Sequence, residues 1–87
     1  MTELTYFYLP NCPHCKLATR LLSELAAENP AYAAVPVRRV DESADKATAA
    51  AYDYWYVPCF FLGQTKLHEG HAEKEDVRRV LDAALKG

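Results

Sequence analysis

The first forty residues alternate between two kinds of hydrophobic pattern, and this alternation limits the folds open to the chain. Residues 4–9 form a short aromatic run without charge, which is typical of a strand buried on both faces. Over residues 13–28, apolar side chains recur at helical spacing, at Ala18, Leu21, Leu22 and Leu25. Residues 34–40 read as a second strand, with Pro36 near its start or at an edge. This order predicts a right-handed crossover between two parallel strands.

The remaining residues extend this pattern to a complete α/β domain. Asp41, Glu42 and Ser43 offer a helix N-cap, and the alanine-rich stretch after them predicts a helix over residues 44–54. Two strands over 57–62 and 65–68 are joined by a turn signal at Gly63 and Gln64, which indicates a hairpin. A last apolar stripe predicts a helix over 72–86. The order βαβαββα predicts a four-stranded mixed sheet with helices on both faces, in a single domain over residues 1–87.

Composition excludes several classes of protein. Ten basic and twelve acidic side chains give a net charge of −2, which argues against a nucleic-acid partner. The longest run free of both charge and strong polarity, residues 54–62, is far shorter than the about 20 residues of a membrane-spanning helix, so we expect no membrane partner. The first residues of the chain include the acidic Glu3, whereas a signal peptide has basic residues there. We therefore expect a cytoplasmic protein, which we also take to be a monomer.

The residues between the first strand and the first helix carry the chemistry. Cys12-Pro13-His14-Cys15 begins where the strand ends, and Pro13 suits the first helical position. Cys12 then occupies the N-cap, where unpaired N–H groups and the helix dipole favour a thiolate. Cysteines in such motifs have pKa values of roughly 3.5–7.5, and a protonated His14 and Lys16 would act in the same direction. We predict that Cys12 is the nucleophile of disulfide exchange and that Cys15 is the resolving thiol.

Two other interpretations of these cysteines remain open. They could be inert, buried side chains, or they could form half of a metal site. The sequence has no second Cys-x-x-Cys and no His-x-x-x-His, so a zinc or iron–sulfur module would have to use Cys12, Cys15 and Cys59. Cys59 is more simply explained as a strand cysteine packed under a helix. We predict that no metal is bound.

The whole chain resembles the thioredoxin superfamily in the residues around two prolines. Cys12-Pro13-His14-Cys15 follows a hydrophobic strand, and Val57-Pro58 precedes another one some 45 residues later. The short chain is most similar to glutaredoxin, the minimal version of that fold. Taken alone, Pro58 would be expected in a trans peptide bond at a strand start. The resemblance instead implies a cis bond that faces the cysteine pair, and a Val57 backbone that pairs with an extended thiol substrate.

The loop that binds glutathione in glutaredoxins differs here. Leu9 stands where those proteins usually have a lysine. Before the last helix, glutaredoxins have the sequence Gly-Gly-Cys-Asp, whose aspartate and backbone amides hold glutathione. This chain keeps one glycine there, Gly70, followed by His71, and has lost the aspartate. The resemblance implies that Gly70 and His71 contact substrate, while the lost residues argue against glutathione as a bound cofactor. Asn11 also replaces the tryptophan of thioredoxins, and the first strand offers no carboxylate for their buried aspartate.

The sequence thus predicts an enzyme or electron carrier of the glutaredoxin and thioredoxin type. It would exchange disulfides of a protein or small-molecule substrate through the Cys12–Cys15 pair. A thiol reductant, thioredoxin reductase or glutathione, would restore the dithiol, and no cofactor would be required. The Pro-His dipeptide is similar to that of strongly oxidising disulfide-forming enzymes, so we expect a more oxidising pair than that of thioredoxin.

Overall fold

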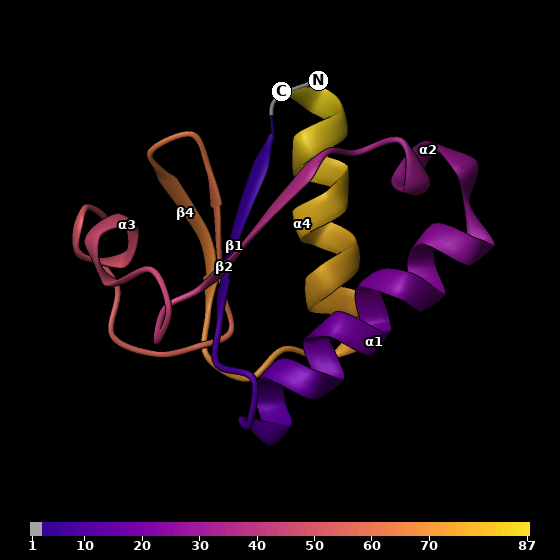
Figure 1. The fold of residues 1–87 in the computed structure, drawn as a ribbon. Helices are drawn as coiled ribbons and strands as arrows, with labels where there is room; N and C mark the ends of the chain where they lie inside the picture. Colours follow the sequence, from indigo (N-terminus) through magenta and orange to yellow (C-terminus); the bar gives the residue numbers. More distant parts are fainter. Residues whose placement is uncertain (1–2) are drawn as a thin grey trace.

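The chain alternates strands and helices in a computed structural model that describes residues 3–87 (Figure 1). Residues 1 and 2, the start of the predicted domain, lie outside the described range. The elements within it are β1 (Leu4–Tyr8), α1 (Pro13–Glu28), α2 (Pro30–Ala33), β2 (Val37–Asp41), α3 (Lys46–Ala50), β3 (Cys59–Leu62), β4 (Thr65–Glu69) and α4 (Lys74–Lys86).

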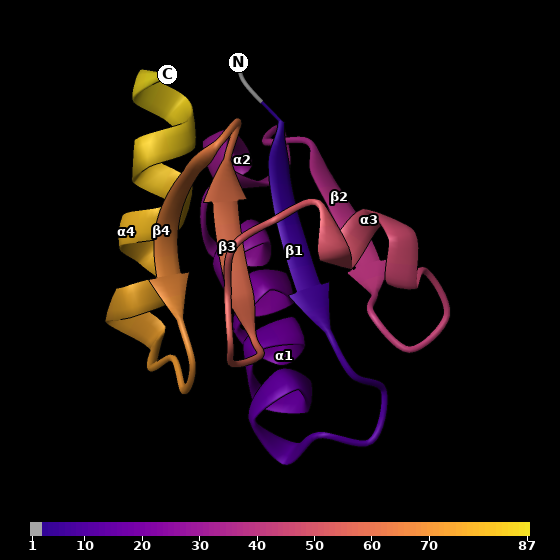
Figure 2. The ribbon, with the colours of Figure 1, turned by 90° about the vertical axis from the view of Figure 1, so that its left-hand side faces the viewer.

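The strands of residues 3–87 form one four-stranded sheet in the order β2-β1-β3-β4 (Figure 2). β1 and β2 are parallel, with Phe7 opposite Val40, as the crossover requires. β3 is antiparallel to both β1 and β4, and the β3–β4 turn uses Gly63 at a φ of 61°. The predicted mixed sheet and the order βαβαββα are therefore confirmed.

Several predicted boundaries differ from the observed ones. A short helix, α2, follows α1 because the Asn29 side chain accepts a hydrogen bond from the Ala31 N–H at 3.0 Å and Pro30 fits the first helical position. The helix predicted over 44–54 covers only Lys46–Ala50. It ends early because Tyr52 packs onto Phe7 in the core, with ring centroids 4.9 Å apart.

The strands β2 and β3 and the last helix, α4, also begin later than predicted, each at a recognisable signal. β2 begins after Pro36, which has no N–H for the sheet. β3 begins after the Val57–Pro58 peptide bond. α4 begins at Lys74 because Glu73 forms a capping box with Asp76.

Both faces of the sheet are covered, which explains why β1 does not alternate between apolar and polar residues. α1 and α4 lie on one face of the sheet (Figure 1). Tyr6 stacks on Phe60 on this face, with ring centroids 4.8 Å apart. α3 and the loop after it lie on the other face, around Phe7 and Phe61. Tyr6 and Phe7 are adjacent in β1 and point to opposite faces, and both are fully buried. β1 is thus held rigidly between two cores, and the chain leaves it directly into the cysteine motif.

None of the helices in the described part of the chain has the length and apolar character that crossing a bilayer demands.

Stability should depend strongly on the core between the sheet and α1. Leu25 is fully buried there, so Leu25→Ala should lower the free energy of unfolding by about 2–5 kcal/mol, because it removes packed methyl groups and leaves a cavity. Glu24→Ala, on the exposed side of the same helix, should change it by less than about 0.5 kcal/mol. Urea denaturation of both variants measures the difference. Equal effects of the two substitutions would contradict this packing.

Candidate active site

Cys12 lies at the junction of β1 and α1, at the N-cap of the helix. Its backbone is extended, with φ −84° and ψ 121°, and Pro13 takes the first helical position. The Cys12 carbonyl accepts the first helical hydrogen bond from the Lys16 N–H at 3.0 Å. His14 and Lys16 are exposed on the first turn of α1. The Cys12 sulfur therefore lies beside N–H groups that have no partner within the helix.

The surroundings of Cys12 lower the pKa of its thiol. Partial burial is the largest single influence and raises the pKa, but the backbone N–H of Cys15, the Cys15 thiol and the backbone N–H of His14 together outweigh it. The Cys12 side chain itself makes no cap hydrogen bond. The thiolate is favoured because the N–H and S–H groups around the sulfur form stronger hydrogen bonds with a charged sulfur than with a neutral one.

Cys15 is one helical turn away and has the opposite character. It is buried, and burial is the main reason that its pKa rises to about 12, with a further increase from the nearby Cys12. The Leu9 N–H donates to its sulfur at 3.4 Å, and the Tyr6 hydroxyl donates to its carbonyl at 2.9 Å. One thiol of the pair therefore ionises readily and the other holds its proton.

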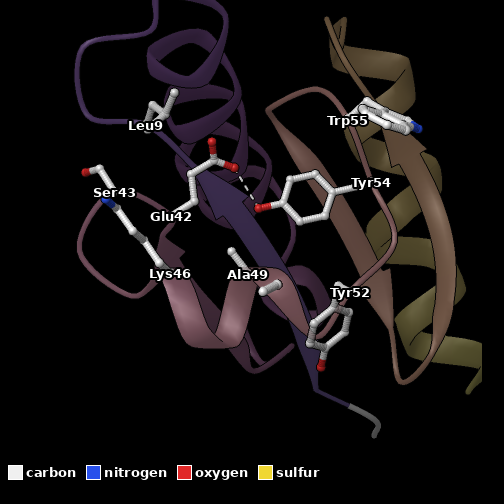
Figure 3. A pocket seen from close by; sticks show the side chains of 9 residues that line it. Leu9, Glu42, Ser43, Lys46, Ala49, Tyr52, Tyr54 and Trp55 are labelled. Carbon is white, nitrogen blue, oxygen red and sulfur yellow. Dashed lines mark hydrogen bonds between the residues drawn. The ribbon is translucent and has the colours of Figure 1, made fainter.

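Glu42 is a carboxylate beside this pair, although its position in the sequence predicts only a part in a helix N-cap. It follows β2, and its N–H donates to the Tyr8 carbonyl at 3.1 Å. Its side chain accepts a hydrogen bond from the Tyr54 hydroxyl at 2.6 Å across a pocket of about 540 Å³ (Figure 3). The charge of Glu42 contributes to the raised pKa values of Cys15 and Cys59. Only the sheet register, which the sequence does not show, places it there.

The Val57–Pro58 peptide bond is cis, as the family resemblance implies and contrary to the expectation from the sequence alone. The Pro58 carbonyl accepts a hydrogen bond from the Gly70 N–H at 2.8 Å. Gly70 has a φ of 90°, which side chains other than glycine rarely tolerate. This bond joins two of the predicted substrate-binding segments, 57–58 and 70–71.

A second contact fixes the loop before Pro58. Glu69, at the end of β4, accepts hydrogen bonds from the backbone N–H groups of Trp55 and Tyr56, the latter at 2.8 Å. Lys66 donates to its other oxygen at 2.6 Å. Lys66, followed by these two N–H groups, lowers the pKa of Glu69 to about 2. The loop therefore holds two large exposed aromatic side chains, Trp55 and Tyr56, on a fixed backbone.

His71 contacts the cysteine motif directly. Its Nδ1 lies 2.9 Å from the Nδ1 of His14, and the two rings meet edge to face. An open groove of about 400 Å³ adjoins the motif, with Leu9, Asn11, Cys12 and Ser43 among its lining residues. The structure thus brings the segments 12–15, 57–58 and 70–71 to one end of the sheet.

Cys59 is separate from this arrangement. It is fully buried in the core cluster with Phe7, Val40 and Phe61, and burial raises its pKa to about 12. Within residues 3–87, no group of three histidine, cysteine, aspartate or glutamate side chains is placed to hold a metal ion. The alternative interpretation, in which Cys12, Cys15 and Cys59 share a metal, therefore has no geometric support.

The sheet order, the cysteine pair at the start of α1 and the cis proline before β3 define an α/β protein with the thioredoxin fold. The model of the Thioredoxin family matches residues 2–86, and the chain belongs to this family. No curated protein matches it in sequence.

Two solved structures have similar folds at low sequence identity. One is a malarial protein, with a TM-score of 0.71, 15% identity and coverage of 98% of each chain. The other is a mutant thioredoxin from Halobacterium salinarum NRC-1, with a TM-score of 0.70 and 20% identity, over 97% of this chain and 74% of that one. At these identities the likeness concerns the fold alone.

Glu69→Gln should loosen the loop that carries Trp55, because a neutral amide accepts weaker hydrogen bonds than a carboxylate and no longer forms the ion pair with Lys66. Trp55 is the single tryptophan, so its fluorescence anisotropy reports this loop, and it should fall in the variant. Because the folded pKa of Glu69 is lowered to about 2, wild-type protein should hold the loop above the ordinary glutamate pKa and release it as the pH falls towards 2. Glu24→Gln is the matched control. Unchanged anisotropy in Glu69→Gln would contradict the assignment.

Proposed function

We propose that the protein is a dithiol–disulfide oxidoreductase or electron carrier that uses Cys12 and Cys15. The observation that carries this proposal is the asymmetry of the pair. Cys12 is partly exposed with a lowered pKa, and Cys15 is buried with a pKa of about 12. Disulfide exchange needs an accessible thiolate to attack and a second thiol that stays protonated until the adduct has formed.

The reaction follows from these two protonation states. The Cys12 thiolate attacks one sulfur of a substrate disulfide, forms a mixed disulfide and expels the other sulfur as a thiolate, which takes a proton from solvent. Cys15 then loses its proton and attacks the Cys12 sulfur, which releases the second substrate thiol. The substrate has gained two electrons and two protons, and the protein is left with a Cys12–Cys15 disulfide. A separate thiol reductant returns the dithiol.

The substrate would bind beside Cys12 along the loops that carry Val57, Pro58, Gly70 and His71. Exposed aromatic side chains are good contact surfaces for polypeptides, and Trp55 is 84% exposed next to this region. The groove at Leu9 and Ser43 offers further contact surface beside Cys12. These features favour a disulfide in a polypeptide, although a small-molecule disulfide would meet the same thiolate.

The reductant would be thioredoxin reductase or glutathione, and the loop at Gly70 and His71 favours the first. His71 is engaged with His14 in this structure, where a glutaredoxin would receive the tripeptide. The Pro13-His14 dipeptide and the lowered pKa of Cys12 support a pair more oxidising than that of thioredoxin. We propose that the protein works as a monomer in the cytoplasm, with no bound metal or organic cofactor.

Cys15→Ser should trap the reaction halfway, because the mixed disulfide on Cys12 then has no resolving thiol. The variant should form a stable covalent adduct with a disulfide-containing peptide, seen by mass spectrometry, and should lose turnover. Cys12→Ser should form no adduct. Cys59→Ser should behave as wild type in the assay, since Cys59 is buried in the other core. Adduct formation through Cys59 or Cys15 in place of Cys12 would contradict the proposal.

Parallel turnover assays separate the reductants, one with glutathione and its reductase and one with thioredoxin reductase. We expect activity with thioredoxin reductase and little or none with glutathione.

Metal analysis of freshly purified protein tests the alternative function. Stoichiometric metal that is lost in Cys59→Ser would support a metal-binding module and overturn the redox proposal.

A further inference from the structure

The pocket that contains Glu42 takes no part in the disulfide exchange itself. Its volume is about 540 Å³, and its lining residues come from the end of β1, the segment after β2, α3 and the loop after α3 (Figure 3). Leu9 and Ser43 line both this pocket and the groove beside Cys12, so the pocket and the groove meet at these two residues. A substrate joined to Cys12 by its sulfur can therefore place a neighbouring side chain in the pocket.

Three aromatic side chains line the pocket and are held by contacts elsewhere in the protein. Tyr54 stacks on the buried Phe7 with ring centroids 4.7 Å apart, and Tyr52 meets the same ring at 4.9 Å. The third is Trp55, whose backbone N–H donates to Glu69. The aromatic surface is thus formed before a ligand arrives, and binding does not require it to be ordered first.

Glu42 places a carboxylate beside these rings. Its Oε1 accepts a hydrogen bond from the Tyr54 hydroxyl at 2.6 Å, and its backbone N–H donates to the Tyr8 carbonyl. Burial, followed by the hydrogen bond to Glu42 and the charge of that carboxylate, raises the pKa of Tyr54, so the hydroxyl keeps its hydrogen and acts as the donor. The Oε2 of Glu42 accepts no hydrogen bond from residues 3–87. A carboxylate accepts several donors, so this oxygen is available to a ligand.

Lys46 is the other charged residue that lines the pocket. Its side chain extends towards Ser43, away from the contact between Glu42 and Tyr54 (Figure 3). None of the ion pairs within residues 3–87 includes Lys46 or Glu42. The carboxylate therefore has no cationic partner in the protein, and it is the charge that a ligand meets beside the aromatic rings.

A carboxylate next to aromatic rings is a site of the kind that binds a cation, and arginine suits it best. A guanidinium is planar, stacks on aromatic faces and donates paired hydrogen bonds to a carboxylate. The attraction between a cation and a ring adds to this. The aliphatic stem of arginine or lysine can pack on apolar lining such as Ala49. An acidic side chain would instead be repelled by Glu42.

We propose that this pocket is a specificity subsite, which binds an arginine or lysine side chain close to the disulfide cysteine of a substrate polypeptide. The pocket and the groove share two lining residues, and an extended chain advances about 3.3 Å per residue, so the basic residue should lie within about four residues of that cysteine. The inference rests on the proposed function and narrows its substrates to polypeptides with a basic residue near the disulfide.

Matched peptides test this in the Cys15→Ser variant, which holds the peptide on Cys12 and removes any influence of Glu42 on Cys15. Each peptide has one cysteine, in a mixed disulfide with nitrothiobenzoate, and arginine, norleucine or glutamate at one position up to four residues from it. Attack of the Cys12 thiolate on the peptide sulfur joins the peptide to Cys12 and expels the coloured nitrothiobenzoate anion, whose absorbance gives the rate. At the best position, the arginine peptide should react about threefold to tenfold faster than the norleucine peptide, and the glutamate peptide should react most slowly.

Substitutions in the same background assign this preference to Glu42. Glu42→Gln should bring the ratio of the arginine to the norleucine rate close to one, because the amide can still accept from Tyr54 but carries no charge. Asp53→Asn is the matched control and should keep the ratio, since Asp53 is an exposed carboxylate of the same loop as Tyr54 and does not line the pocket. Lys46→Gln should keep or raise the ratio. An unchanged ratio in Glu42→Gln, or a fall in Lys46→Gln, would overturn the proposal.

The emission of Trp55 provides a second readout, because this single tryptophan lines the pocket and the peptides contain none. The purified arginine adduct should differ in emission from the norleucine adduct, and the difference should vanish in Glu42→Gln. Identical emission of the two adducts would place the arginine outside this pocket and contradict the assignment.

The proposed function and this inference fail in different ways. If no peptide is captured on Cys12, the redox proposal itself is lost. If all three peptides are captured at equal rates, disulfide exchange stands and only the subsite is wrong. If the glutamate peptide reacts fastest, Lys46 and not Glu42 selects the ligand, and the proposal is overturned in favour of an acidic side chain.

Discussion

The thiolate preference of Cys12 depends on the backbone N–H groups at the first turn of α1. These groups reach the sulfur only because β1 ends where it does and α1 begins at Pro13. β1 in turn is fixed by two cores, with Tyr6 buried on one face and Phe7 on the other. A rigid strand, a proline at the first helical position and a cysteine at the N-cap together give the site its charge preference, without a charged side chain in direct contact.

Three segments far apart in sequence meet at this end of the sheet, and β4 connects two of them. Glu69 fixes the backbone of Trp55 and Tyr56, and the next residue, Gly70, donates to the Pro58 carbonyl. His71 then reaches the cysteine motif. The loop around Gly70 and His71 is thus occupied with contacts inside the protein.

The order of elements, the position of Cys12 and the buried Cys59 could be predicted because they depend on local patterns: helical spacing, an N-cap with proline after it, and a short apolar strand. The early end of α3 could not, because Tyr52 leaves the helix to pack on Phe7, a contact across the sheet. Glu42 and Glu69 were missed for the same reason. Each looks like an ordinary surface carboxylate in the sequence, and only the strand register brings it to the site. The cis bond at Pro58 followed from the family resemblance and not from the residues themselves.

The asymmetry of the two active-site thiols is most directly tested by the ultraviolet absorbance of thiolate in the reduced protein as the pH is raised. Cys12→Ser serves as the reference, so that tyrosine ionisation cancels. The structure predicts that one thiolate, absent from the variant, forms below the free cysteine pKa of about 8.5, and that Cys15 stays protonated through that range. If no thiolate is seen before that pH, or if both sulfurs ionise together there, the helix terminus does not activate Cys12 and the account is wrong.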